Sequence, residues 1–175
     1  PQVFDMPEPL TEVEMESLRE TLPHFFLGGN QKVINETIDA LKLLQKAQDL
    51  GSIMKFEISE STRYAIETAL RSADEIYFPF LKHLRLMLVL TKKFATLCMN
   101  PPYMGNGNMN TTLSKYVKDN YEKGKADLFS TFMILAIDNL LDNGKYGMIN
   151  MHSWMFLSSF ESLRKEIISD RKSVV

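Results

Sequence analysis

The chain has 175 residues, of which 45% are hydrophobic and 24% are charged, so it has the composition of a soluble globular protein and the length of one domain. Its formal net charge is −2 and its pI is about 6.0, which excludes a strong positive field over the whole molecule and requires any DNA contact to be local. The single cysteine, Cys98, excludes an internal disulfide and fits a reducing compartment.

The sequence begins with a short apolar piece between prolines, and we expect a sheet strand and its lead-in over residues 1–9. No leader precedes this piece, so we expect the chain to come from the middle of a longer protein. Neither a secretory leader nor a long apolar run occurs, which predicts no membrane span, no membrane partner and a cytoplasmic location.

Residues 10–93 have the apolar periodicity of helices, and we predict a large helical insertion over this stretch. We expect its helices at residues 11–22, 31–50, 61–78 and 79–93. Residues that commonly start or stop helices agree with these bounds at Asn30, Gly51, Ser59 or Ser61, and Pro79.

An apolar stretch from Phe94 to Met99 predicts a buried strand of an α/β sheet, with Cys98 as an inert core thiol. The turn Asn100-Pro101-Pro102-Tyr103 follows directly, and its prolines end the strand because neither can donate a ladder hydrogen bond. The turn therefore holds an amide, a proline carbonyl and an aromatic ring at the carboxyl end of a strand, where open α/β sheets bind their ligands.

The chain after this turn alternates between helix and strand. A Gly- and Asn-rich loop over 104–110 precedes a polar helix at 112–121, and Asp127 is expected to cap an amphipathic helix that ends at the turn 142–144. A strand is expected at 146–151, and the last helix is marked by Phe156, Phe160, Leu163 and Ile167. This order predicts an α/β fold with a right-handed parallel unit.

The chemistry of the turn suits a planar group that carries an exocyclic NH2. The Asn100 side-chain oxygen and the Pro101 carbonyl can each accept one amine proton, and Tyr103 can stack on the ring. Two acceptors localise the nitrogen lone pair and make the amine nucleophilic without a side-chain base. If the group is adenine N6 in a duplex, the base must first be flipped out of the stack.

Three further segments appear in a characteristic order after the turn: Asp127-Leu128-Phe129-Ser130-Thr131-Phe132, Asn143-Gly144-Lys145-Tyr146-Gly147 and the stretch Ser153 to Arg164. With the turn, they resemble the adenine-N6 DNA methyltransferases of restriction-modification and phage-exclusion systems, and most closely the large single-chain ones. The resemblance covers roughly residues 94–169.

The resemblance implies a partial Rossmann-like methyltransferase sheet, with parallel strands and helices on both faces. It implies S-adenosylmethionine as the methyl donor and double-stranded DNA with a flipped adenine as the partner. Asn100 and Pro101 would bind the amine, Pro102 would fix the turn and Tyr103 would stack on the base. Phe132, with Asn100, matches a position at the methyl-donor site, although a core role fits it equally.

The glycine-rich loop that binds the donor in this family is missing from residues 1–93. Residues 94–175 therefore correspond to the C-terminal part of a catalytic domain. We expect a fragment that carries the base-binding half of the active site, that is inactive in isolation and that works with the rest of its parent chain.

Other substrates remain open, because the same turn occurs in methyltransferases that act on a protein glutamine or on guanine N2 of RNA. A non-catalytic DNA-binding or assembly module is a further alternative. The local basic cluster of Lys115, Lys118, Lys123 and Lys125, interleaved with Tyr116 and Tyr121, is a candidate DNA contact or an ordinary solvated helix face.

A few side chains have two interpretations each. We favour Asp127 as a helix cap over a catalytic acid, Trp154 and Phe156 as packing residues over base contacts, and His152 as a core or rim residue. The three histidines and the lone cysteine have no metal-ligand spacing, so no metal site is expected.

Overall fold

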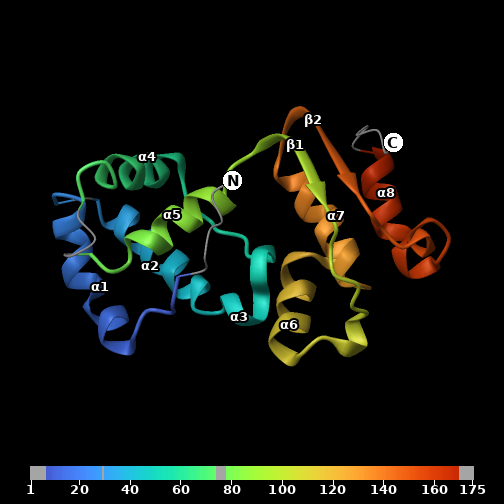
Figure 1. Ribbon diagram of the computed structural model, residues 1–175, viewed down its shortest axis with the longest axis horizontal. Helices are drawn as coiled ribbons and strands as arrows, with labels where there is room; N and C mark the ends of the chain where they lie inside the picture. The colour runs from blue at the N-terminus through green and yellow to red at the C-terminus, as the bar shows by residue number, and fades with distance from the viewer. Residues whose placement is uncertain (1–6, 29, 74–77, 170–175) are drawn as a thin grey trace. The chain divides into compact units, whose positions relative to one another are not determined.

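The computed structural model describes residues 7–28, 30–73 and 78–169 and divides the chain into two compact units, Pro1–Thr91 and Lys92–Val175. We call them the helical unit and the α/β unit (Figure 1). Most of the strand expected over 1–9 lies outside the described residues, and residues 7–9 belong to no helix or strand.

The described part of the helical unit contains the α-helices α1 (Glu12–Phe25), α2 (Gln31–Leu44), α3 (Ala47–Leu50), α4 (Glu60–Ala69) and α5 (Leu81–Leu90). The predicted cap of α2 is confirmed, because the Asn30 side chain accepts a hydrogen bond from the Lys32 backbone N–H at 2.8 Å. Of the two candidate caps for α4, Ser59 is the one that caps it. Side-chain oxygens thus satisfy backbone donors that a helix start leaves free.

Three predicted helix bounds in this unit are wrong. The single helix expected over 31–50 is broken, since the Lys46 N–H donates to the Leu43 carbonyl at 3.0 Å and interrupts the regular helical ladder. Helix α4 ends at Ala69, well short of residue 78, and residues 74–77 lie outside the described residues. Helix α5 begins at Leu81 instead of Pro79, and Phe80, the residue before it, packs its ring against Phe25 with ring centroids 5.3 Å apart.

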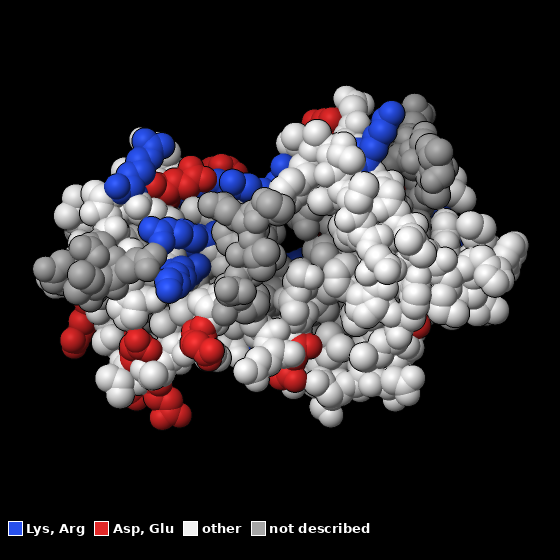
Figure 2. Space-filling view, in the orientation of Figure 1, with Lys and Arg blue, Asp and Glu red and all other residues white. Residues whose placement is uncertain are grey.

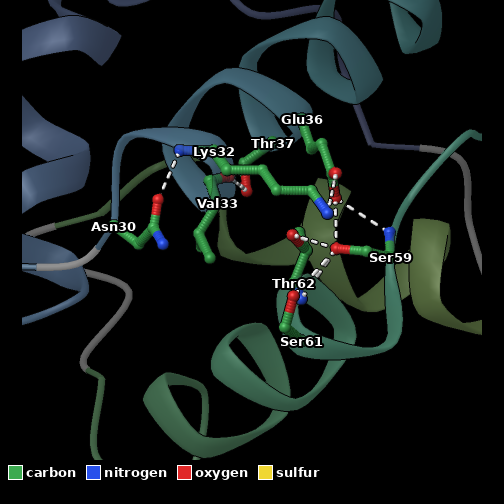
Figure 3. A network of polar contacts seen from close by, with 8 residues as sticks. All are labelled: Asn30, Lys32, Val33, Glu36, Thr37, Ser59, Ser61 and Thr62. Carbon is green, nitrogen blue, oxygen red and sulfur yellow. Dashed lines mark hydrogen bonds and ion pairs between the residues drawn. The ribbon is translucent and has the colours of Figure 1, made fainter.

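A partly buried carboxylate network fastens α2 to the start of α4 (Figure 3). The Glu36 carboxylate accepts hydrogen bonds from the Ser59 N–H and the Ser59 hydroxyl, both at 2.8 Å, and lies 3.6 Å from the Lys32 ammonium. Burial tends to raise the pKa of Glu36, but the hydrogen bonds from Thr62 and Ser59 together lower it to about 2. The same serine that caps α4 therefore also anchors it to α2.

The α/β unit contains β1 (Phe94–Met99), α6 (Thr111–Asn120), α7 (Leu128–Asp138), β2 (Leu140–Met148) and α8 (Glu161–Ser169). Short 3-10 turns lie at 106–108, 122–124, 152–155 and 158–160. The two strands pair in parallel, as Figure 1 shows by their arrows, and they form a two-stranded sheet within the described residues. The predicted β1 and the α/β class are confirmed.

The pairing of β1 with β2 contains an irregularity. Phe94 pairs with Leu140, but Thr96, two positions later, pairs with Lys145, five positions later. The additional residues include Asn143, which has a positive φ of 64°, and Gly144, which lies against the backbone. They belong to β2, so the turn expected at 142–144 and the strand expected at 146–151 are wrong: α7 ends at Asp138 and β2 spans Leu140–Met148. A Cβ at Gly144 would lie 3.0 Å from the Phe94 carbonyl oxygen, so glycine permits this close approach.

One face of the sheet packs on the main core of the unit. Tyr146 and Met148 contact a cluster of α7, α8 and the turn before α8, which consists of Phe129, Met133, Ile137, Trp154, Phe160, Leu163 and Ile167. On the other face, Thr96, Cys98 and Lys145 are exposed. The expectation of a buried β1 with a core thiol is therefore wrong: in the part of the chain that the structure describes, β1 has one neighbouring strand and this core covers one face.

The segment before α8 also differs from the expectation. Trp154 is buried, as predicted, but Phe156 belongs to no helix and is 72% exposed. The helix begins five residues later, at Glu161, after two 3-10 turns. None of the described helices is long and apolar enough to cross a membrane.

Candidate active site

The turn Asn100–Tyr103 lies where the two parallel strands end. The Ile149 N–H, directly after β2, donates to the Met99 carbonyl at 3.2 Å, so the chain leaving β2 runs beside the start of the turn. Pro101 is buried, whereas Asn100, Pro102 and Tyr103 are exposed. The start of the turn is therefore held in place by the end of β2, and the Asn100 amide and the Tyr103 ring lie at the surface.

The ring of Tyr103 is held at two points. Its hydroxyl donates a hydrogen bond to the Ile149 carbonyl at 2.9 Å, and its ring meets the Phe129 ring edge to face, with centroids 6.0 Å apart and planes at 68°. The side chain is nevertheless 48% exposed. An aromatic surface with a set orientation and open area is what stacking on a planar ligand requires.

Asp127 fixes the chain that follows the turn. Its carboxylate accepts hydrogen bonds from the Met104 N–H at 3.0 Å and from the Phe129 N–H at 3.2 Å. The Leu128 N–H donates in turn to the Met104 carbonyl at 2.9 Å. Asp127 is therefore the cap of α7, as predicted, and it also joins the first turn of that helix to the segment after Tyr103.

The two expected donor-site residues lie on different elements. Asn100 is in the turn, and Phe132 is half-buried on α7. Pockets of about 230, 570 and 480 Å³ are each lined by residues of the helical unit. None of these three pockets includes Asn100 or Phe132 in its lining.

The four lysines of the predicted basic cluster differ in their surroundings. Lys115 and Lys118 are exposed on α6, whereas Lys123 forms an ion pair with Glu166 of α8 and Lys125 with Glu122. Tyr121 is buried, and this burial raises its pKa. The interpretation of Tyr121 as an aromatic DNA contact is therefore wrong, because its ring belongs to the core.

Two of the histidines, His83 and His152, belong to different units. His83 is buried in the helical unit, where its Nε2 lies 2.8 Å from the Glu8 carbonyl and burial lowers its pKa. His152, expected to be a core or rim residue, is exposed in the α/β unit, so the core position is wrong, and its ring centroid lies 6.1 Å from that of Phe156. No group of possible metal ligands occurs among residues 7–28, 30–73 and 78–169.

Sequence reasoning missed the residues that support Tyr103. Phe129 had a detectable signal, since it is an apolar residue two positions after the helix cap. Ile149 contributes only a backbone carbonyl, for which the side-chain sequence gives no signal.

Comparison with known proteins identifies similar sequences. Residues 30–174 match the family described as Eco57I restriction-modification methylase. The chain is 32% identical over 181 residues to the adenine-specific methyltransferase PglX of Lacticaseibacillus casei (strain Zhang), covering 97% of the chain and 14% of that protein. It is 32% identical over 129 residues to the adenine-specific methyltransferase BrxX of Escherichia coli O9:H4 (strain HS), covering 74% of the chain and 11% of that protein.

Proposed function

Because the chain belongs to the Eco57I restriction-modification methylase family, we propose that it is part of an adenine-N6 DNA methyltransferase and that its Asn100–Tyr103 turn binds the flipped adenine. The names of the two relatives support adenine as the substrate. The chain spans only 14% and 11% of the length of these two relatives, so it corresponds to a part of each. The observation that carries the proposal is the half-exposed Tyr103 ring, fixed by Ile149 and Phe129 next to the exposed Asn100 amide.

The turn acts on the amine of the base. The Asn100 side-chain oxygen accepts a hydrogen bond from one N6–H group and the Pro101 carbonyl accepts one from the other, so the nitrogen lone pair is localised on the amine. The nitrogen would then bond to the donor's methyl carbon as that carbon's bond to sulfur breaks, and one N6 proton would pass to solvent. Tyr103 stacks on the adenine and holds its plane, a contact of roughly 1 to 3 kcal/mol. Asp127, through Met104 and Phe129, keeps the turn and the ring in register.

The family implies S-adenosylmethionine, which supplies an electrophilic methyl group on a positively charged sulfur. Of the residues in this chain, Asn100 and Phe132 are the candidates to contact it. They hold an edge of the donor, and the glycine-rich loop that would hold its methionine part is absent from residues 1–93. We expect the 175-residue chain alone to be inactive and to bind the donor more weakly than micromolar.

In this proposal a helical insertion spans residues 10–93. The C-terminal part of the catalytic domain spans residues 94–175. The four lysines of the predicted basic cluster are assigned to the DNA phosphates. Lys115 and Lys118 are available for this contact as they stand, whereas Lys123 and Lys125 would have to exchange their ion pairs with Glu166 and Glu122.

The test is methyl transfer by the full-length protein that carries this chain. It is incubated with duplex DNA, RNA and protein substrates and isotope-labelled S-adenosylmethionine, and the labelled product is identified by mass spectrometry. We expect label on adenine N6 of DNA and a loss of about 100-fold in kcat for Asn100→Ala, the scale for removing one transition-state contact. Asn108→Ala, an exposed asparagine of the following loop, is the control.

Label on a protein glutamine or on guanine N2 of RNA, with none on DNA, would replace the substrate in this proposal. No transfer to any of them by a folded full-length protein would favour the assembly module instead.

A further inference from the structure

The segment between β2 and α8 exposes a run of apolar side chains. Met151, Met155, Phe156 and Leu157 are all exposed, and Phe156 most of all. Figure 1 shows this segment as the orange to red chain that leaves β2, and the corresponding edge of the α/β unit in Figure 2 is largely free of charged groups. Contiguous exposed apolar side chains mark a contact surface for another molecule.

The segment is held rigidly. The Arg164 guanidinium, on α8, donates from Nη1 to the Trp154 carbonyl and to the Leu157 carbonyl, each at 2.7 Å. The Phe156 and Leu157 N–H groups both donate to the Ser153 carbonyl, at 3.1 and 3.0 Å. The buried Trp154 anchors the middle of the segment in the core. Phe156 is therefore exposed on a clamped turn.

The same support carries the Asn100–Tyr103 turn. Tyr103 hydrogen-bonds to the Ile149 carbonyl, where the segment begins, and its ring packs on Phe129. Phe129 and Trp154 belong to one core cluster. The clamped segment and the Asn100–Tyr103 turn therefore share both the end of β2 and one core cluster.

The chemistry of the segment fits nucleic acid. Residues 149–157 contain no carboxylate to repel phosphates, and their one titratable group, His152, lies against Phe156. A base that leaves the stack exposes the faces of its neighbours, and proteins commonly stabilise such gaps with apolar wedges. An aromatic ring on a rigid turn suits this role.

We infer that residues 151–157, the part of this segment with the exposed apolar side chains, contact DNA beside the flipped adenine and that Phe156 stabilises the gap left in the stack. The inference rests on the proposed function. Phe156 is thus a DNA-contacting residue that promotes base opening, while Tyr103 holds the base after it has opened.

The experiment compares two DNA duplexes in the full-length protein. In one the target adenine is paired with thymine, and in the other it faces an abasic site and is already free to leave the stack. We expect Phe156→Ala to lower kcat/KM about 10-fold on the paired duplex and to come within about twofold of the natural protein on the abasic duplex, because the lost stacking matters only for opening. Phe156→Trp retains an aromatic surface and should retain activity on both.

Ile168→Ala is the matched control, since Ile168 is an apolar residue of the same unit with 77% exposure. A second readout is the fluorescence of 2-aminopurine at the target position, which rises on flipping and should rise less with Phe156→Ala. Equal loss on both duplexes would assign the segment to folding or to a protein partner and overturn the inference. Unchanged activity on the paired duplex would also overturn it, whereas a natural protein that methylates no adenine would refute the proposed function first.

Discussion

The Tyr103 hydroxyl donates a hydrogen bond of 2.9 Å to the Ile149 carbonyl, and this contact joins the end of one parallel strand to the end of the other. It is a contact between residues 46 positions apart. The orientation of the proposed stacking ring is consequently set by the sheet as well as by the turn.

Two variants of Tyr103 distinguish the contribution of its hydroxyl hydrogen bond from that of its ring. We expect Tyr103→Phe, which keeps the ring, to lower kcat/KM less than about 10-fold, the scale of one hydrogen bond. Tyr103→Ala also removes the ring, and we expect a loss of roughly 10- to 100-fold. Steady-state kinetics of the full-length protein on duplex DNA measure both, and equal losses in the two variants would show that stacking contributes nothing.

The lysines should contribute unequally to DNA binding. Exchanging Lys115 and Lys118 for glutamine should reduce the slope of log affinity against log salt by roughly 2, because each lysine would lose one phosphate contact. Exchanging Lys123 and Lys125, whose charges are engaged by Glu166 and Glu122, should reduce it less. Fluorescence anisotropy over a salt series gives both slopes, and an equal or reversed order would contradict the assignment.

Gly124 is expected to tolerate no side chain. A Cβ there would lie 2.7 Å from the Ser130 carbonyl oxygen, and the Gly124 carbonyl itself accepts hydrogen bonds from the Ser130 and Thr131 hydroxyls. We expect Gly124→Ala to lower the free energy of unfolding by about 1 to 3 kcal/mol. Gly107→Ala is the control, since nothing lies within 4 Å of a Cβ at Gly107. Denaturant unfolding of the chain compares them, and equal stabilities would refute the close approach.

The Glu36 network predicts a pH dependence of stability. Since the pKa of Glu36 falls from 4.5 to about 2 on folding, its carboxylate stabilises the folded state above pH 4.5, and this contribution is lost as the pH falls toward 2. Glu36→Gln should therefore be less stable than the natural chain at neutral pH, and the difference should shrink in acid. Unfolding measured from pH 7 to pH 2.5, with the exposed Glu67→Gln as control, gives this difference, and a constant one would contradict the assignment.

Features that depend on a few neighbouring residues were predictable from the sequence. The caps Asn30 and Asp127 and the strand Phe94–Met99 were predicted correctly, because capping oxygens and an apolar run ended by two prolines act over short distances. The placement of the turn at a strand end follows from the same local signals.

Features that depend on distant residues were not predictable. Cys98 lies in an apolar run, but its exposure is decided by which elements cover the sheet. Phe156 fits a helical spacing, yet its segment lies outside the helix, where Arg164 donates hydrogen bonds to the Trp154 and Leu157 carbonyls. The lysines of the basic cluster are close together in sequence, but Lys123 forms an ion pair with Glu166, which lies 43 positions later in the chain.

The regular part of the β1–β2 pairing makes the register of the two strands decide what the core receives. Side chains alternate between the faces of a strand, so the pairing of Thr96 with Lys145 sends Tyr146 and Met148 to the core face. A shift of β2 by one residue along β1 after the irregularity would turn Lys145 and Gly147 inward and Tyr146 and Met148 outward. The register of two short strands therefore fixes which side chains complete the core under the Asn100–Tyr103 turn.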